Sequence, residues 1–118
     1  MKFKINNVEW EIKEISQKEI KQIQNKKFAN NEENIEDTAH RYYGITYNDD
    51  CIIYLDKDIK QDRKRKTLYH ELTHCYVSSY ITHQDKNYDE EMVADIVSNS
   101  YDIITEISNK YFSEVKDE

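Results

Sequence analysis

The order of apolar and polar side chains divides the chain into strand-like and helix-like segments. At the start, Lys2 to Ile5 and Val8 to Ile15 nearly alternate between the two kinds of residue, and Asn6-Asn7 separates them. Alternation places every second side chain on the same face of a strand, and asparagine favours tight turns. This part of the chain therefore predicts a β-hairpin.

A second pair of strands is predicted near the middle of the chain. Tyr42 to Tyr47 and Cys51 to Leu55 are rich in aromatic and β-branched residues, and Asn48-Asp49-Asp50 lies between them. Gly44, the only glycine, is expected at a bulge or at a close approach of two segments. Together these features predict a second hairpin.

Three segments carry helical features. Ser16, followed three residues later by Glu19, predicts a capped helix that continues to Gln24 or a little beyond. A second helix is predicted from Ile59 or Lys60 to about Ile81, and a third from Glu90 to roughly Tyr111. The apolar residues that support these two helices are Leu68, Leu72, Cys75, Val77 and Tyr80 in the second, and Met92, Val93, Ile96, Val97, Ile103, Ile104 and Ile107 in the third.

These elements predict an α+β fold in a single domain, residues 1 to 118. In it, a small antiparallel sheet built from the two hairpins packs on the second helix and on the C-terminal helix. Asn25 to Asp37 is expected to be a loop or an irregular helix, and Thr82 to Asp89 a polar connection. The chain contains no proline and no low-complexity tract, so no domain boundary is predicted.

Charge and composition exclude some classes of function. The formal net charge of -7 argues against a protein that binds a nucleic-acid backbone, and the basic run within Lys60 to Lys66 is interpreted as the solvated first turns of a helix. No segment resembles a signal peptide or a membrane span, so a cytoplasmic protein is expected. Cys51 and Cys75 are expected to remain thiols. Cys75, beside His74, is interpreted as a small buried residue rather than a fourth metal ligand, because adjacent helical side chains point about 100° apart.

The candidate chemistry lies in the segment His70-Glu71-Leu72-Thr73-His74. On a helix, residues i and i+4 share a face, so two imidazoles at this spacing can converge on one Zn²⁺ ion. Glu71 is displaced around the helix and is predicted to reach the metal-bound water, as a general base, rather than the metal. The alternative is a pair of ordinary helix histidines, because this short motif also arises by chance.

A catalytic zinc site needs a third protein ligand and leaves the fourth position to water. Glu90 and Glu91 begin the last predicted helix. Glu91 is the predicted ligand, because Asp95 lies one turn further along the same face, where its carboxylate can orient a zinc-bound imidazole. Glu90 has Ala94 at that position. The alternative for Glu91 and Asp95 is a solvated acidic helix N-terminus.

A family resemblance rests on these residues. HELTH followed by Glu91-Met-Val-Ala-Asp95 resembles the HExxH…ExxxD arrangement of thermolysin-like zinc peptidases. The local form Glu-x-x-Ala-Asp is most similar to the ImmA/IrrE family of small bacterial and phage metallopeptidases. The glycine turn at Gly44, an edge strand ending in Ile-Tyr-Leu-Asp and the Thr-Leu pair before HELTH are also similar to that family, and the similarity covers roughly Gly44 to Ser98.

The resemblance implies a minimal zincin domain that hydrolyses peptide bonds of a protein or peptide substrate. It implies that His70, His74 and Glu91 bind Zn²⁺, that Glu71 activates water, and that the strand Ile52 to Leu55 pairs with an extended substrate. Family members that act on transcriptional repressors suggest a substrate inside the cell.

The chain also departs from the family pattern. Glycine often stands where this chain has Thr73, and a Phe-Ala pair where it has Val97-Ser98, although neither position is a ligand. No residue matches the oxyanion-stabilising His or Tyr of larger thermolysin-like enzymes. Candidates by proximity in sequence are Tyr76, Tyr80, His83 and Tyr88, each of which has solvent exposure as its simpler interpretation.

Other functions remain open at this point. A zinc-binding module could recognise a peptide by β-augmentation through Tyr42 to Leu55 without cleaving it. A purely structural zinc site would have a closed coordination sphere, and a His-His-carboxylate set also accepts cobalt or manganese. His40 and His83 are interpreted as ordinary surface residues.

Overall fold

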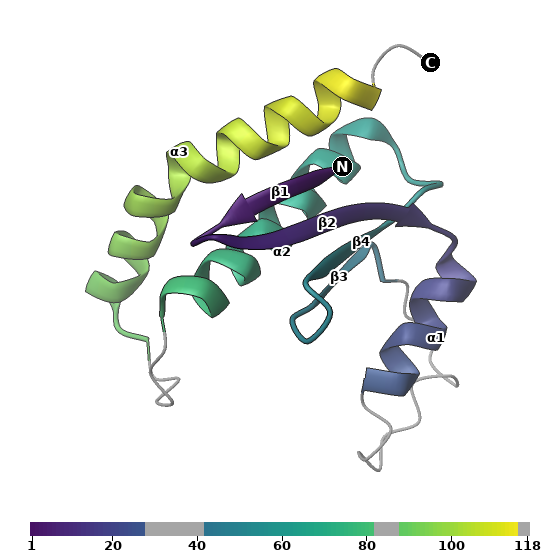
Figure 1. Cartoon of the computed structure of the whole chain (residues 1–118), viewed down its shortest axis with the longest axis horizontal. Helices are drawn as coiled ribbons and strands as arrows, with labels where there is room; N and C mark the ends of the chain where they lie inside the picture. Colours follow the sequence, from purple (N-terminus) through teal and green to yellow (C-terminus); the bar gives the residue numbers. More distant parts are fainter. Residues whose placement is uncertain (28–41, 82–87, 116–118) are drawn as a thin grey trace.

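The computed structural model describes residues 1–27, 42–81 and 88–115. Within these ranges the chain folds as a small α+β domain with four strands and three helices (Figure 1). In chain order they are β1 (Lys2–Ile5), β2 (Val8–Ile15), α1 (Gln17–Lys27), β3 (Gly44–Tyr47), β4 (Ile52–Asp56), α2 (Gln61–Tyr80) and α3 (Glu90–Val115). Each lies where the sequence predicts an element, although α3 continues past Tyr111. Most of the predicted loop from Asn25 to Asp37, together with His40 and His83, lies outside the described residues.

Local turn and cap signals form as predicted. Asn6 and Asn7 both adopt left-handed backbone angles, with φ of 51° and 65°, as a two-residue turn between right-twisted strands requires. Ser16 Oγ accepts a hydrogen bond from the Glu19 backbone N–H at 3.2 Å, which caps α1, and it donates to Glu19 Oε1 at 3.1 Å.

The sheet has the strand order β1-β2-β4-β3 and is mixed. Both hairpins are antiparallel, but β2 pairs with β4 in parallel, with Glu11 opposite Ile52 and Ile15 opposite Asp56. The prediction of an antiparallel sheet was therefore wrong. Alternating side chains specify which face of a strand is buried, but they do not specify the direction of a neighbour that is distant in the sequence.

The strand order also corrects the predicted substrate strand. β4 (Ile52–Asp56) lies between β2 and β3, so its backbone already pairs on both sides. The expectation that Ile52 to Leu55 pairs with an extended substrate is wrong for this reason. Among the described strands, β3 (Gly44–Tyr47) is the edge on that side of the sheet.

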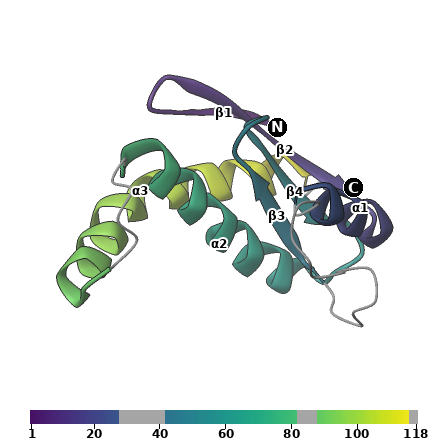
Figure 2. The same cartoon turned by 90° about the horizontal axis from the view of Figure 1, so that it is seen from below.

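The core lies between one face of the sheet and the two long helices. α2 contacts β1, β3 and β4, and α3 packs along α2 (Figures 1 and 2). The buried apolar residues of this core are Phe3, Ile5, Trp10, Ile12, Ile53 and Leu55 from the sheet, Leu68, Leu72 and Cys75 from α2, and Ile104, Ile107, Tyr111 and Phe112 from α3. On α2 the buried positions recur at spacings of three and four, which is the pattern of a helix with one face in a core.

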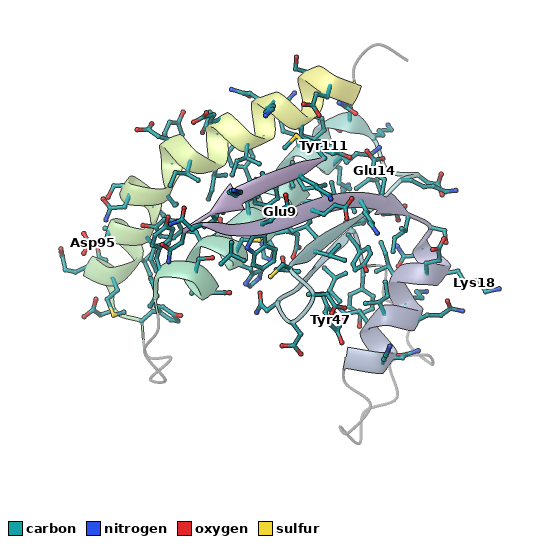
Figure 3. The ribbon with its side chains drawn as sticks, in the orientation of Figure 1. Glu9, Glu14, Lys18, Tyr47, Asp95 and Tyr111 are labelled. Carbon is teal, nitrogen blue, oxygen red and sulfur yellow. The ribbon has the colours of Figure 1, made fainter. Side chains whose placement is uncertain are left out.

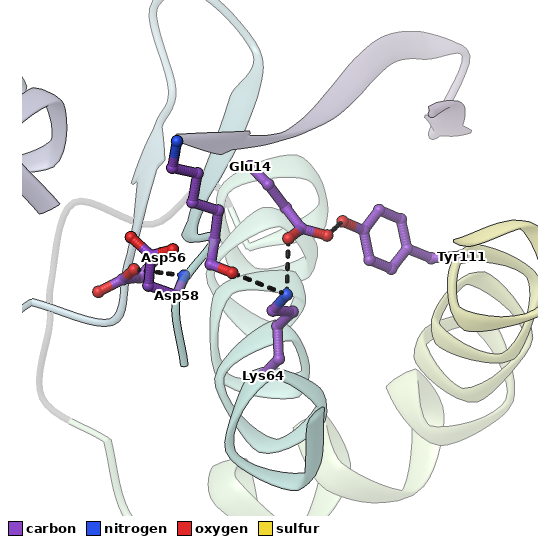
Figure 4. A network of polar contacts seen from close by, with 6 residues as sticks. Glu14, Asp56, Asp58, Lys64 and Tyr111 are labelled. Atoms are coloured by element: carbon purple, nitrogen blue, oxygen red, sulfur yellow. Dashed lines mark hydrogen bonds and ion pairs between the residues drawn. The ribbon is translucent and has the colours of Figure 1, made fainter. Parts of the chain in front are cut away.

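A polar network joins three elements at the edge of this core (Figure 4). Lys64 Nζ of α2 donates to Glu14 Oε1 of β2 at 2.7 Å, and the Tyr111 hydroxyl of α3 donates to the other carboxylate oxygen of Glu14. The basic run is thus solvated only in part, because Lys64 is mostly buried against Glu14. The network fixes α2 and α3 relative to the sheet, since charge-assisted hydrogen bonds are stronger than neutral ones.

Gly44 marks the close approach that the sequence predicts, and its backbone is regular. A Cβ atom at Gly44 would lie 2.7 Å from Thr67 Cγ2 of α2, 3.1 Å from the Tyr54 carbonyl oxygen and 3.3 Å from Glu71 Cγ. The first of these distances is far below van der Waals contact. Glycine therefore lets β3 lie directly against the helix that carries HELTH.

We expect Gly44→Ala to lower the free energy of unfolding by about 1–3 kcal/mol, because the added methyl group forces β3 and α2 apart. Urea denaturation followed by tryptophan fluorescence measures this change. Thr67→Ser removes the methyl group that the new Cβ would meet, so the double variant should recover part of the loss. A Gly44→Ala protein as stable as the wild type would contradict the close packing of β3 on α2.

Candidate metal centre

The two histidines of HELTH lie on the solvent-exposed side of α2. Leu68, Leu72 and Cys75 turn the opposite side into the core, which leaves His70 and His74 one helical turn apart and facing outward. Their rings meet edge to face, with centroids 4.9 Å apart and an interplanar angle of 76°. The Nε2 atoms of the two rings are 3.3 Å apart.

This separation can be compared with the geometry of a shared ion. Two zinc–nitrogen bonds of about 2.0–2.1 Å, separated by a tetrahedral angle of about 109°, place the two nitrogens roughly 3.3–3.4 Å apart. The 3.3 Å between the Nε2 atoms of His70 and His74 agrees with this value. The separation is therefore compatible with two ligands of one Zn²⁺ ion, and it is also the separation of a hydrogen bond between the two rings.

Glu71 faces the sheet, away from the exposed side of the helix. Its side chain is buried, with 6% of the residue exposed, and Oε1 accepts a hydrogen bond from the Thr46 hydroxyl of β3 at 2.8 Å. The same hydroxyl lies 3.1 Å from the Glu71 carbonyl oxygen. A hydroxyl has a single proton, so Thr46 shares it between these two acceptors. The carboxylate is therefore held beside the edge strand of the sheet.

Thr46 is the residue of this site that sequence reasoning missed. It lies on the strand face that points toward α2, next to Ile45 and opposite Ile53 of β4. Its only signal in the sequence is a polar side chain at a core-facing position of a short apolar strand. A buried hydroxyl requires a hydrogen-bonding partner, so this position indicates a polar contact but does not identify the acceptor.

The structure does not place Glu91, the predicted third ligand, in one group with His70 and His74. Glu91 and Asp95 are exposed residues in the first turns of α3. Across residues 1–27, 42–81 and 88–115, no three His, Cys, Asp or Glu side chains are grouped so that they could share an ion. The roles of Glu91 as a ligand and of Asp95 as its hydrogen-bonding neighbour stay predictions.

Asp95 instead lines a hollow between the end of α2 and the start of α3, with a volume of about 290 Å³. Figure 3 shows Asp95 on the N-terminal part of α3, away from the sheet. Tyr76 and Tyr80, two of the candidates for oxyanion stabilisation, also line this hollow, with their ring centroids 4.9 Å apart. Tyr88 is exposed, and His83 lies outside the described residues.

Cys75 is a core residue, as predicted. It is fully buried among Leu68, Leu72 and the sheet residues. Burial raises the pKa of the Cys75 thiol, and the charge of Glu71 raises this pKa further. Cys75 points into the core while His70 and His74 face outward, so its thiol is not directed toward the histidine pair.

Comparisons with protein-family models, with curated proteins and with solved structures found no match to this chain. Among the described helices, none combines the length and the apolar composition that a membrane crossing requires.

Proposed function

We propose that this protein is a zinc-dependent metallopeptidase that hydrolyses peptide bonds of a protein substrate in the cytoplasm. The observation that carries the proposal is the convergence of the His70 and His74 Nε2 atoms at the separation expected for two zinc ligands. The resemblance of HELTH and Glu91–Asp95 to the ImmA/IrrE family supports the same function. In this proposal His70, His74 and Glu91 hold the ion, and the domain is a minimal zincin.

Zinc, when bound, would supply a Lewis acid that polarises the scissile carbonyl and makes water more acidic. The protein's own residues then position the substrate and move the proton. Glu71 is the general base: its Oε2 takes a proton from the attacking water and returns it to the nitrogen of the leaving amine. Thr46 holds Oε1 of the same carboxylate at 2.8 Å and limits the orientations that Glu71 can adopt.

The edge strand β3 is the proposed place for the substrate backbone. β3 borders the sheet and lies against α2, as the contacts of Gly44 and Thr46 with Glu71 require. An extended peptide that pairs with an edge strand gains backbone hydrogen bonds without regard to its sequence. In this arrangement the scissile bond would lie close to Glu71.

A second candidate function uses the same edge without catalysis. The domain would bind zinc and recognise a peptide through β3, and Glu71 would serve only to pack α2 against the sheet. The observation that favours this alternative is the burial of Glu71, whose carboxylate already accepts the Thr46 hydrogen bond. The two functions differ in what they predict for Glu71→Gln, which is argued in the Discussion.

The ligand set is tested by the zinc content of untagged protein, measured by elemental analysis. We expect about one zinc ion per chain for the wild type and for Glu90→Ala, and loss of zinc in His74→Ala and Glu91→Ala. Glu90→Ala is the matched control, because it removes the neighbouring carboxylate from the same turn of α3.

Two outcomes would contradict the proposal. If no zinc binds even when the ion is supplied, HELTH is an ordinary helix segment and the peptidase function is wrong. If zinc is lost in His74→Ala but retained in Glu91→Ala, the histidine pair binds the ion and the assignment of Glu91 is wrong.

A further inference from the structure

β1 is an edge of the sheet with a regular pattern of side chains. Among the described strands it is the outermost on its side, and β2 is its neighbour (Figure 1). Its sequence, Lys-Phe-Lys-Ile, alternates exposed lysines with buried apolar residues. Lys2 and Lys4 thus lie on the solvent-facing side of the sheet, and Phe3 and Ile5 lie on the side that packs on the helices.

The hydrogen bonds between β1 and β2 fix the direction of each backbone group in β1. The Ile12 N–H donates to the Met1 carbonyl oxygen at 2.8 Å, and the Met1 amino group donates to the Ile12 carbonyl oxygen at 3.1 Å. In an antiparallel pair, residues that exchange two such bonds alternate with residues that exchange none. The N–H and C=O groups of Lys2 and Lys4 therefore point away from β2, toward the outer edge of the sheet.

A hollow of about 280 Å³ lies between β1 and α3. Both elements contribute to its apolar lining, with Phe3 and Ile5 from β1 and Ile103 and Ile107 from α3. Because Phe3 and Ile5 belong to the helix-facing side of the sheet, the hollow lies on that side. It can therefore take the apolar side chains of a strand placed beside β1.

The register of β2 shows which side chains complement β1 in a neighbouring strand. Glu11 of β2 lies opposite Lys2, and Glu9 lies opposite Lys4, whereas the residues between them form apolar pairs. Opposite charges and apolar pairs directly across two strands both stabilise a sheet. A strand that alternates acidic and apolar residues therefore also complements the outer edge of β1, with its apolar side chains in the hollow.

Among the described strands of a second copy of this chain, none offers that pattern at an edge. β2 has the required alternation, but it is already paired with β1 and β4. A second β1 would place lysines beside lysines, which is unfavourable. β3, Gly44–Tyr47, contains no acidic residue. The complementary strand therefore belongs to a different protein.

We propose that the outer edge of β1 binds an extended segment of a partner protein in which acidic and apolar residues alternate. Lys2 and Lys4 each present an N–H and a C=O group to the backbone of this segment, as in other cases of strand addition. The acidic side chains of the segment lie beside the two lysines, and its apolar side chains fill the hollow next to α3. This site is at the opposite edge of the sheet from β3 and does not depend on zinc.

The test uses a peptide of about eight residues with blocked ends, in which Glu and Val alternate. The full-length protein, labelled with ¹⁵N, is titrated with this peptide, and amide hydrogen exchange is measured with and without it. We expect saturable chemical-shift changes at residues 2 to 5. Exchange of the Lys2 and Lys4 amides should slow by at least about tenfold, because these amides become newly paired. The amides of Phe3 and Ile5 are the internal reference, since they already bond to β2.

A matched peptide and two substitutions separate backbone pairing from charge. A peptide of alternating Lys and Val should not bind, because its charges repeat those of β1. Lys4→Pro removes the outward N–H, at a position where an edge strand tolerates proline, whereas Lys4→Gln removes only the charge. We expect Lys4→Pro to bind the Glu and Val peptide at least about tenfold more weakly than Lys4→Gln. The amide spectrum checks the folding of each variant.

Four results would overturn the proposal. No binding of either peptide would mean that the lysines only keep this edge from pairing with other strands. Equal affinity of Lys4→Pro and Lys4→Gln would mean that the backbone of β1 does not hold the peptide. Shifts confined to residues 44 to 47 would place the peptide at the opposite edge. A wild-type dimer in sedimentation experiments that dissociates in Lys4→Pro would show that a second copy covers β1.

Discussion

Glu71→Gln is expected to reduce peptide hydrolysis by about 100- to 10,000-fold, while the protein stays folded and keeps its zinc. The amide has nearly the same size as the carboxylate, and its oxygen can still accept the Thr46 hydrogen bond that is 2.8 Å long in the wild type. It cannot take a proton from water at neutral pH. Cleavage of an unstructured protein such as casein, followed by mass spectrometry with zinc supplied, measures the effect.

Two further variants test whether the loss of hydrolysis is specific to the Glu71 carboxylate. Glu9→Gln introduces the same chemical change at an exposed position of β2 and should leave hydrolysis unchanged. Thr46→Val keeps the carboxylate but removes its hydrogen-bond donor, so it should slow hydrolysis less than Glu71→Gln. If wild type and Glu71→Gln bind the same peptides and neither cleaves them, the domain is a recognition module and not an enzyme.

Leu72→Ala is expected to lower the free energy of unfolding by about 3 kcal/mol, within the range of 2–5 kcal/mol for such a truncation in a core. Leu72 is fully buried in the core, on the side of α2 opposite His70 and His74. Domains of this kind are stable by only about 5–15 kcal/mol, so the change removes a substantial part of the total. Urea denaturation followed by the fluorescence of buried Trp10 measures it.

An exposed valine provides the control for Leu72→Ala. Val97 is 61% exposed, and Val97→Ala should change the free energy of unfolding by less than about 0.5 kcal/mol. Zinc affinity should fall with Leu72→Ala, because His70 and His74 are held by the packing of the helix face that Leu72 occupies. A variant that unfolds at the same urea concentration as the wild type would mean that α2 does not pack on the sheet through Leu72.

Local sequence signals predicted most of the fold because each acts over a few residues. The Asn6-Asn7 turn and the Ser16 cap of α1 require only neighbouring atoms, and both form as predicted. The mixed sheet was not predicted, because the parallel pairing of Glu11 with Ile52 depends on how distant segments return to the sheet. No periodicity within either strand contains that information.

The candidate site shows the same division between local and distant contacts. Spacing along one helix predicted that His70 and His74 converge, and their Nε2 atoms lie 3.3 Å apart. The hydrogen bond from Thr46 to Glu71 joins β3 to α2 and depends on the packing of two elements, so spacing did not reveal it. Glu91 stands on a third element, and its predicted role depends on the relative placement of α2 and α3.

The parallel pair β2 and β4 also bears on how the chain folds. Each hairpin needs only a short turn to close, so both can form early from contacts between near neighbours. Joining them requires the register that places Glu11 opposite Ile52, and this closes a loop of roughly forty residues before any contact of the shared core is gained. Assembly of the two hairpins into one sheet is therefore the slow step expected in folding, and α2 gains its full packing surface only after that step.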